Sequence, residues 1–274
     1  MPDFPRSAAK GLRWLLLLAV AAVTPIIFTA CGTPGSTVGL PARLASVATP
    51  IGTTYVPILL FNGAGTSASD VSAVEAILGT LKLGYSTANS TQLNAMSETK
   101  LKTYKLFVVP GGNSITIGKN LSATATTNVR NAIQKDGLHY LGICAGAFFG
   151  GHSIYNGLDL TSGVWFNFYA DYYKGIHKEP VEISRPGAGR LDIYWENGPQ
   201  LSGWGSVVGK YPDGTPAIVE GKSGNGFVVL SGVHPEAPAS WRYGMTFTTP
   251  LSVDLAYAGT LVQYALNGSN LPHY

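Results

Sequence analysis

Apolar positions recur with two different periods from residue 55 onward, and they predict strands that alternate with helices. Short apolar runs typical of buried strands lie at residues 55–61, 105–109 and 138–143. Ser69 and Asp70 are predicted to cap the first intervening helix. In the helical segments apolar residues share one face: Val71, Val74, Ile77, Leu78 and Leu81 in the first, Val129 and Ile133 in the second. Strands alternating with helices predict an α/β fold with a mostly parallel sheet and helices on both faces.

The second half of the chain has a different sequence pattern. Residues 164–169 and 191–195 are aromatic stretches between glycines and prolines, and they predict strands and hairpins. Residues 227–231 predict another buried strand, and residues 252–266 predict a last helix that covers the sheet. An aromatic stripe is also compatible with carbohydrate binding, but packing on a half-buried sheet is the favoured interpretation.

The N-terminal segment predicts export instead of a folded element. Residues 14–30 form a nearly unbroken apolar run behind three basic residues, Arg6, Lys10 and Arg13. The run is at the short limit for spanning a bilayer, and Pro25 would break a helix near its end. Cleavage of a signal peptide is therefore favoured over a permanent anchor.

The end of this apolar run predicts a lipid attachment site. Residues 28–32, Phe-Thr-Ala-Cys-Gly, resemble the lipobox of bacterial lipoproteins, in which the cysteine becomes the lipidated first residue of the mature chain. We therefore expect a signal peptide over residues 1–30, with lipid on Cys31; an ordinary cleaved signal or an uncleaved anchor is the alternative. Residues 31–54 are rich in Gly, Pro, Ser and Thr and predict a flexible tether. The folded domain is predicted over residues 55–274. The signal peptide and the lipid on Cys31 together predict an exported cell-envelope lipoprotein.

Composition narrows the classes of partner. Hydrophobic residues make up 45% of the 274 residues, which supports a substantial core. Charged residues make up only 12%, without a cluster of Lys and Arg, so nucleic acid is not expected as a partner. Removal of the predicted signal peptide would lower the net charge from +3 to +1. Metal-ligand spacing and a dinucleotide glycine signature are both missing from the sequence, so we expect no metal and no cofactor.

The segment with the clearest chemistry is Gly-Ile-Cys-Ala-Gly at residues 142–146. A buried strand that ends in a glycine-flanked nucleophile and restarts as a helix forms an elbow, because the glycines let the backbone fold back without a Cβ clash. Cys144 would lie at the first turn of the helix, where unpaired N–H groups favour the thiolate. The alternative is a small buried hydrophobe. With lipid on Cys31, Cys144 would have no disulfide partner, since the chain contains two cysteines.

A His-Pro-Glu triplet lies about ninety positions beyond this cysteine. Proline favours an extended conformation for His234, so His234 and Glu236 are predicted to project to one side, as residues i and i+2 do on a strand. A carboxylate could then brace an imidazole that takes the thiol proton from Cys144. The alternative for the triplet is an ordinary surface turn.

The order of the motifs resembles a known superfamily. Pro-Gly-Gly at residues 110–112, the cysteine elbow and Gly-Val-His-Pro-Glu at residues 232–236 each follow a predicted strand, as in class I glutamine amidotransferases. Within that superfamily, four segments look like the biotin-protein ligase N-terminal domain family: residues 61–65, 108–114, 140–149 and 231–236.

The resemblance covers residues 55 to about 243 and implies a flavodoxin-like, class I glutamine amidotransferase-like fold. It also implies Cys144 as nucleophile and an oxyanion hole formed by the backbone N–H groups of Gly112 and Ala145. Glutamine-hydrolysing members often carry glutamine four positions after the nucleophile, where this chain has Phe148. No synthetase or biotin-ligase catalytic domain is expected in these residues, so biotin ligation is not implied.

Three functions follow as hypotheses. The first is a membrane-tethered thiol hydrolase that cleaves a small-molecule or peptide amide through a Cys144 acyl-enzyme. The second is a binding domain on the same scaffold that has lost turnover, favoured by Phe148. The third is a cell-envelope peptidase or amidase, which shares the chemistry of the first but acts on a different substrate.

Overall fold

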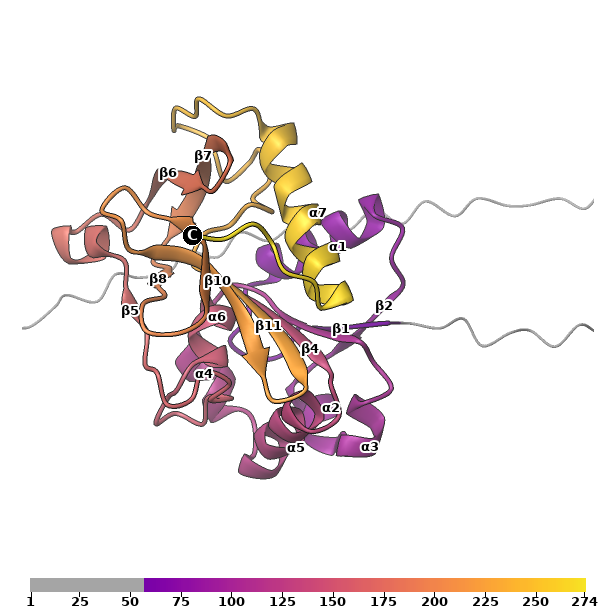
Figure 1. The fold of residues 1–274 in the computed structure, drawn as a ribbon. Coiled ribbons are helices and arrows are strands. Elements are labelled where there is room, and N and C mark those ends of the chain that lie inside the picture. Colours follow the sequence, from indigo (N-terminus) through magenta and orange to yellow (C-terminus); the bar gives the residue numbers. More distant parts are fainter. Residues whose placement is uncertain (1–56) are drawn as a thin grey trace, which may run out of the picture. The chain divides into compact units, whose positions relative to one another are not determined.

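The central sheet has a parallel half and an antiparallel half, as the ribbon of the computed structural model shows (Figure 1). The structure describes residues 57–274. The predicted signal peptide, lipidation site Cys31 and tether lie outside the described residues, as does the predicted first residue of the domain. The nine strands follow the order β2-β1-β3-β4-β11-β10-β9-β6-β7.

Five neighbouring strands of this sheet are parallel, which confirms the predicted mostly parallel α/β core. They are β1 (Ile58–Phe61), β2 (Tyr85–Ala88), β3 (Leu106–Val109), β4 (His139–Ile143) and β11 (Gly226–Ser231). Every residue of β1 and β3 is buried. Strands buried on both faces are continuous apolar runs, so these were visible in the sequence, whereas the half-exposed β2 was not predicted.

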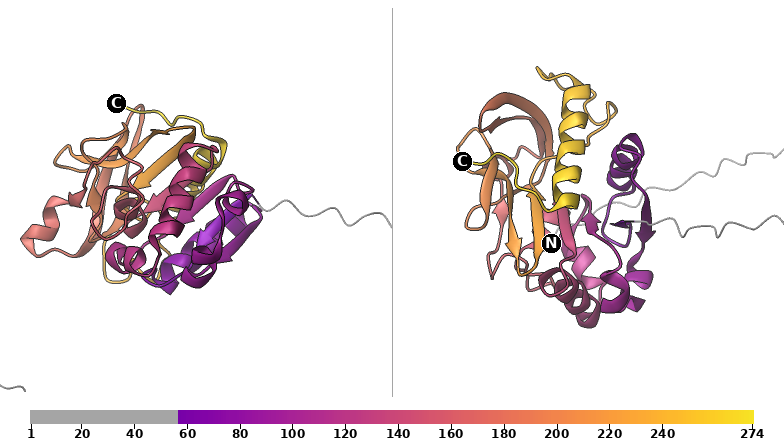
Figure 2. Two further views of the ribbon diagram at one scale, coloured as in Figure 1. Left: turned by 90° about the horizontal axis from the view of Figure 1, so that it is seen from below. Right: turned by 45° about the vertical axis from the view of Figure 1, so that its right-hand side comes forward.

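Helices cover both faces of the parallel half (Figure 2). On one face, α1 (Ala68–Thr80) and α7 (Leu251–Asn267) pack on Leu60, Val108 and Leu141. The opposite face packs against the remaining α-helices: α2 (Ser90–Ala95), α3 (Glu98–Leu101), α4 (Ser114–Lys119), α5 (Ala123–Gln134) and α6 (Ala145–Gly150).

The first helix begins earlier than predicted. Ser67, and not Ser69 or Asp70, is its N-cap, and the Ser67 side chain accepts a hydrogen bond from the backbone N–H of Asp70. Asp70 therefore lies inside the first turn of α1 with its carboxylate free for other contacts.

The antiparallel half is built from β6 (Lys178–Arg185), β7 (Ala188–Glu196), β9 (Ser206–Lys210) and β10 (Pro216–Ser223). The predicted strand at residues 191–195 lies within β7. The predicted strand at residues 164–169 is wrong for most of its length. Only β5 (Asn167–Phe168) is extended, paired with β8 (Pro199–Gln200), and the 3-10 helix η1 (Ala170–Lys174) follows.

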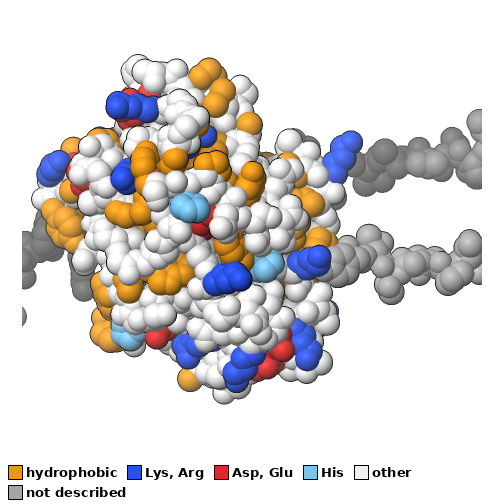
Figure 3. Space-filling model, viewed as in Figure 1, with side chains coloured by type: hydrophobic (Ala, Val, Ile, Leu, Met, Phe, Trp, Pro, Cys, Tyr) orange, Lys and Arg blue, Asp and Glu red, His pale blue; other side chains and the backbone are white. Residues whose placement is uncertain are grey.

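Charged side chains are sparse on the face drawn in Figure 3. Lysine and arginine side chains there lie apart from one another or near acidic ones. Among residues 57–274, no helix is both long enough and apolar enough to cross a bilayer.

Candidate active site

The carboxyl ends of the parallel strands lie at one edge of the sheet, where the predicted site residues meet. The order in which strands are added to the sheet reverses at β1, since β2 lies on one side of β1 and β3 on the other. Ligands of open α/β sheets bind outside the carboxyl ends of strands at such a point. The segments after β1, β3, β4 and β11 all contribute to a cavity of about 760 Å³ at this edge.

Cys144 forms a sharp elbow between β4 and α6. Its backbone has φ 50° and ψ −104°, a conformation that a residue with a Cβ adopts only when the surroundings impose it. A Cβ on Gly142 would lie 2.5 Å from the Gly146 carbonyl oxygen, and one on Gly146 would lie 1.9 Å from the Val109 carbonyl oxygen. The two glycines thus allow the close approach of β3, β4 and α6 that holds Cys144 in this conformation.

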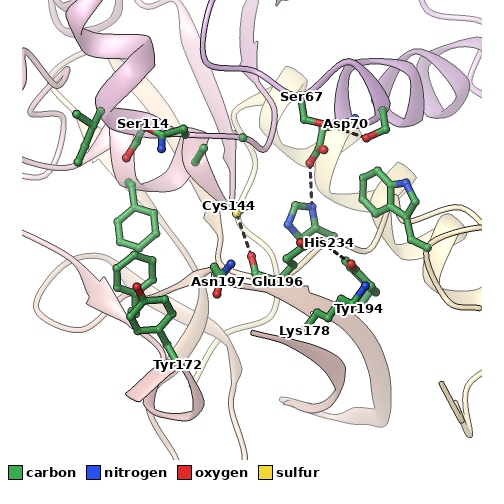
Figure 4. Close-up of a pocket in the computed structure, with 18 of the residues that line it drawn as sticks. Ser67, Asp70, Ser114, Cys144, Tyr172, Lys178, Tyr194, Glu196, Asn197 and His234 are labelled. Carbon is green, nitrogen blue, oxygen red and sulfur yellow. Dashed lines mark hydrogen bonds and ion pairs between the residues drawn. The ribbon is translucent and has the colours of Figure 1, made fainter. Parts of the chain in front are cut away.

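The Cys144 thiol lies in the cavity wall and is 6% exposed. Its hydrogen bond goes to the backbone carbonyl oxygen of Glu196, at 3.5 Å (Figure 4). His234 lines the same cavity beside it. Transfer of the thiol proton to His234 therefore requires the S–H bond of Cys144 to rotate away from the Glu196 carbonyl oxygen, a change compatible with the looser geometry of ligand-free sites.

His234 is held from three directions. Its backbone N–H donates to the Tyr194 carbonyl oxygen at 2.8 Å, and its ring lies 5.6 Å from that of Trp241. Its Nδ1 lies 2.9 Å from Oε1 of Glu236, which is 2% exposed. Burial by itself lowers the pKa of His234, but the adjacent Cys144 and Glu236 raise that pKa well above its ordinary value.

The His-Pro-Glu triplet is extended at His234, as predicted, because His234 pairs with Tyr194 in an isolated β-bridge, but Pro235 and Glu236 lie in a tight turn and not on a strand. The backbone N–H of Ala237 donates to the His234 carbonyl oxygen at 3.2 Å and closes the turn. The turn leaves Glu236 on the same side as the imidazole, with its Oε1 2.9 Å from Nδ1 of His234. The predicted contact between His234 and Glu236 is present, but through a different backbone conformation.

Asp70 is a site residue that sequence reasoning missed. Its Oδ1 lies 3.4 Å from Nδ1 of His234, the same nitrogen that contacts Glu236, and Asp70 is 7% exposed. A Cβ on Gly111 would lie 1.9 Å from this same oxygen, so the glycine after β3 makes room for the carboxylate. The available signal was the place of Asp70 just after a buried parallel strand, near the edge where such strands meet.

Asp70, His234 and Glu236 also form the only group with metal-ligand geometry in the described part of the chain. Their ligand atoms lie within 4.8 Å of one another. A cation there would have to displace the hydrogen bond between Glu236 and the imidazole.

The two residues predicted to form an oxyanion hole, Gly112 and Ala145, both line the cavity. Ala145 is the first residue of α6, whose first intrahelical bond joins Phe148 N–H to the Cys144 carbonyl oxygen. The Gly112 N–H makes no hydrogen bond among residues 57–274. Unpaired N–H groups beside a nucleophile can stabilise the charge that develops on an attacked carbonyl.

A half-buried carboxylate on β6, that of Glu179, should make stability depend on pH. Burial and the neighbouring Asp171 raise the pKa of Glu179 to about 7, against the opposing effect of Lys174. Because the folded protein holds this proton more tightly than the unfolded chain, the stabilisation is full below about pH 4.5 and is lost as pH rises through about 7.

We therefore expect the melting temperature to fall between pH 5 and pH 8. In Glu179→Gln this fall should be smaller by roughly 2 to 4 °C, which corresponds to a change in the free energy of unfolding of ~1 kcal/mol in a domain of this size. Thermal melts across this range would measure it. Glu182→Gln, on the exposed face of β6, is the matched control. Identical pH dependence in both variants would contradict the assignment.

The arrangement of this sheet defines a fold class shared with solved structures. PurLQS from Thermotoga maritima aligns with a TM-score of 0.52 at 16% identity, over 76% of this chain and 97% of that chain. A protein described as part of a GMP synthase, from Thermoplasma acidophilum, aligns with a TM-score of 0.50 at 11% identity, over 77% and 93%. These likenesses confirm the predicted class I glutamine amidotransferase-like fold.

A match to a protein-family model gives a narrower classification than the fold does. Residues 56–178 match the family "Biotin-protein ligase, N terminal", which confirms the predicted resemblance over that segment. The segment includes Cys144 but ends before His234 and Glu236. No curated protein matches the chain in sequence.

Proposed function

We propose that the protein is a thiol hydrolase that cleaves a carboxamide or amide through an acyl-enzyme on Cys144. The observation that carries the proposal is an elbow cysteine that shares a cavity with a histidine, His234, whose Nδ1 is hydrogen-bonded to a buried carboxylate. The elevated pKa of His234 favours an imidazolium beside a thiolate, which is the reactive pair for acyl transfer.

In the proposed reaction, His234 accepts the thiol proton and the thiolate attacks the amide carbon, with the oxyanion facing the N–H groups of Gly112 and Ala145. The carbon–nitrogen bond then breaks, and the imidazolium gives its proton to the departing amine. Water next attacks the thioester, passes one proton to the imidazole and releases the carboxylic acid. The proton returns to the thiolate, so atoms and charge balance over the cycle.

The test is alkylation of Cys144 by iodoacetamide as a function of pH. We expect selective labelling at neutral pH in the wild type. In His234→Ala labelling at neutral pH should slow, because the cation that favours the thiolate is gone. An alkylation profile unchanged by His234→Ala would overturn the proposal.

The two carboxylates on His234 should contribute unequally. Glu236 is closer to Nδ1 than Asp70, 2.9 Å against 3.4 Å. Glu236→Gln retains size but loses the charge that stabilises the imidazolium, so release of p-nitrophenol from p-nitrophenyl acetate should slow by roughly ten- to a thousandfold. Asp70→Asn should slow it by less than about tenfold. An equal or larger effect of Asp70→Asn would make Asp70 the principal brace.

A binding domain without turnover is the second candidate. It is supported by the low exposure of Cys144 and by the hydrogen bond of its thiol to Glu196. A thiol that resists alkylation until the protein unfolds would favour this function. A cell-envelope peptidase or amidase is a narrower form of the first candidate and shares its test.

We further propose that lipid on Cys31 holds the protein to a membrane after export. The support is the basic segment, apolar run and lipobox-like residues in front of Cys31. The intact mass of membrane-extracted protein should correspond to a chain that begins at Cys31 and carries diacylglycerol. An unmodified N-terminus at another residue would refute this proposal, and Cys31→Ala should release the protein from the membrane fraction.

A further inference from the structure

Three aromatic side chains form one wall of the Cys144 cavity. Phe148 lies four positions after the nucleophile in α6, Phe168 lies in β5 and Tyr172 lies in η1, and all three line the cavity. The rings of Phe148 and Phe168 meet edge to face at 5.1 Å, and those of Phe168 and Tyr172 stack at 4.0 Å. We refer to these three residues as the aromatic wall.

The wall lies on the side where an acyl group must bind. In the proposed reaction His234 protonates the departing amine, so the leaving group lies on the His234 side of Cys144. Tyr172 lies across the cavity, on the other side of Cys144 from His234 (Figure 4). The carbonyl carbon is held at the thiol between them, so the acyl portion of the substrate extends toward the aromatic wall.

The charges of the cavity lie on the other side. Asp70 contacts His234, and Glu196 accepts a hydrogen bond from the hydroxyl of Tyr194, whose ring is 5.9 Å from that of His234. Lys178 is the cross-strand partner of Glu196. The wall itself presents ring faces and one phenol hydroxyl.

This distribution disfavours glutamine as the acyl donor. The acyl portion of glutamine ends in an ammonium and a carboxylate, and burying either against ring faces would leave it without a partner. A planar or branched apolar side chain would instead gain dispersion contacts and remove apolar area from water.

The wall is also held in place and continues beyond the cavity. Phe168 is paired with Pro199 across β5 and β8, and Asp171 and Lys174 form an ion pair within η1. A second cavity, of about 260 Å³, shares Phe148 and Phe168 with the first and is lined by the exposed Trp165 and Tyr173. An acyl portion longer than one residue therefore meets a further apolar surface.

We propose that the aromatic wall is the acyl-side subsite, and that the substrate is an amide of an aromatic or large apolar acid, such as a peptide with that residue before the cleaved bond. This inference rests on the proposed thiol chemistry of Cys144. It assigns Phe148, Phe168 and Tyr172 as specificity-determining residues.

The test compares three probes that alkylate Cys144: N-acetyl-phenylalanyl chloromethyl ketone, its alanyl counterpart and iodoacetamide. The phenylalanyl probe should react at least tenfold faster than the alanyl probe. Phe148→Ala and Tyr172→Ala should each reduce this ratio to about one. Tyr172→Phe should retain the preference for the phenylalanyl probe. Tyr274→Ala, on the exposed C-terminal segment, should leave the rates of the phenylalanyl and alanyl probes unchanged.

The outcomes separate the two proposals. A wild-type ratio near one, or a ratio that survives both wall substitutions, overturns the subsite while normal iodoacetamide labelling preserves the thiol chemistry. Inactivation by 6-diazo-5-oxonorleucine, an analogue of glutamine, at a rate equal to or above that of the phenylalanyl probe also overturns it. An iodoacetamide profile insensitive to His234→Ala overturns the thiol chemistry and with it the subsite.

Discussion

Cys144→Ala and His234→Ala should each slow the release of p-nitrophenol from p-nitrophenyl acetate by roughly a thousandfold or more, and the double variant should be scarcely slower than either. The physical reason is that the thiolate and the imidazolium act as one unit. Once either partner is removed, the other has no proton to exchange, and its own removal costs little more. Stopped-flow measurement of the burst and the steady state on all three variants gives the coupling directly.

His273→Ala is the matched control for loss of a histidine. His273 lies near the C-terminus, where its Nδ1 is 3.0 Å from the Leu271 carbonyl oxygen, away from the cavity. Its substitution should change the rate by less than about twofold. If the losses in the two active-site variants multiply in the double variant, Cys144 and His234 act independently and no shared proton transfer exists.

Gly146→Ala should be the most destabilising small substitution at the elbow, by roughly 2–4 kcal/mol. The added Cβ would lie 1.9 Å from the backbone carbonyl oxygen of Val109, which belongs to β3 and cannot turn away as a flexible side chain would. The Tyr140 hydroxyl also donates to the Gly146 carbonyl oxygen at 2.7 Å and resists displacement of α6. The melting temperature should fall by roughly 5 to 15 °C.

Gly79→Ala is the control with the opposite expected sign. Gly79 lies in α1, and a Cβ there would meet nothing within 4 Å. Alanine leaves the unfolded chain fewer conformations than glycine does, and the helix accepts it without strain. This variant should therefore be more stable by ~0.4–1 kcal/mol. Equal free energies of unfolding for Gly146→Ala and Gly79→Ala, measured in urea, would show that α6 packs less closely against β3 than in the structure.

Some features of the site follow from short segments of sequence. The glycines at 142 and 146 predicted the elbow because a sharp strand-to-helix turn leaves no room for side chains at those positions. The apolar runs of β1, β3, β4 and β11 predicted the parallel core because strands buried on both faces cannot alternate with polar residues.

Other features were missed or mistaken because they depend on contacts between segments. Residues 164–166 have the composition of a strand, but they have no partner strand and form no regular secondary structure. Asp70 was read as a helix cap, since nothing local shows that the segments after β1, β3 and β11 bring it beside His234.

The sequence by itself determined which positions require glycine, where the buried strands run and that a cysteine lies at a strand end, because backbone sterics and burial act over a few residues. Only the tertiary structure decided that His234 lies beside Cys144, that Asp70 joins Glu236 on one imidazole nitrogen and that three rings from separate segments form a wall. These depend on closing loops of tens of residues between elements, and the closure is set by how the whole sheet packs.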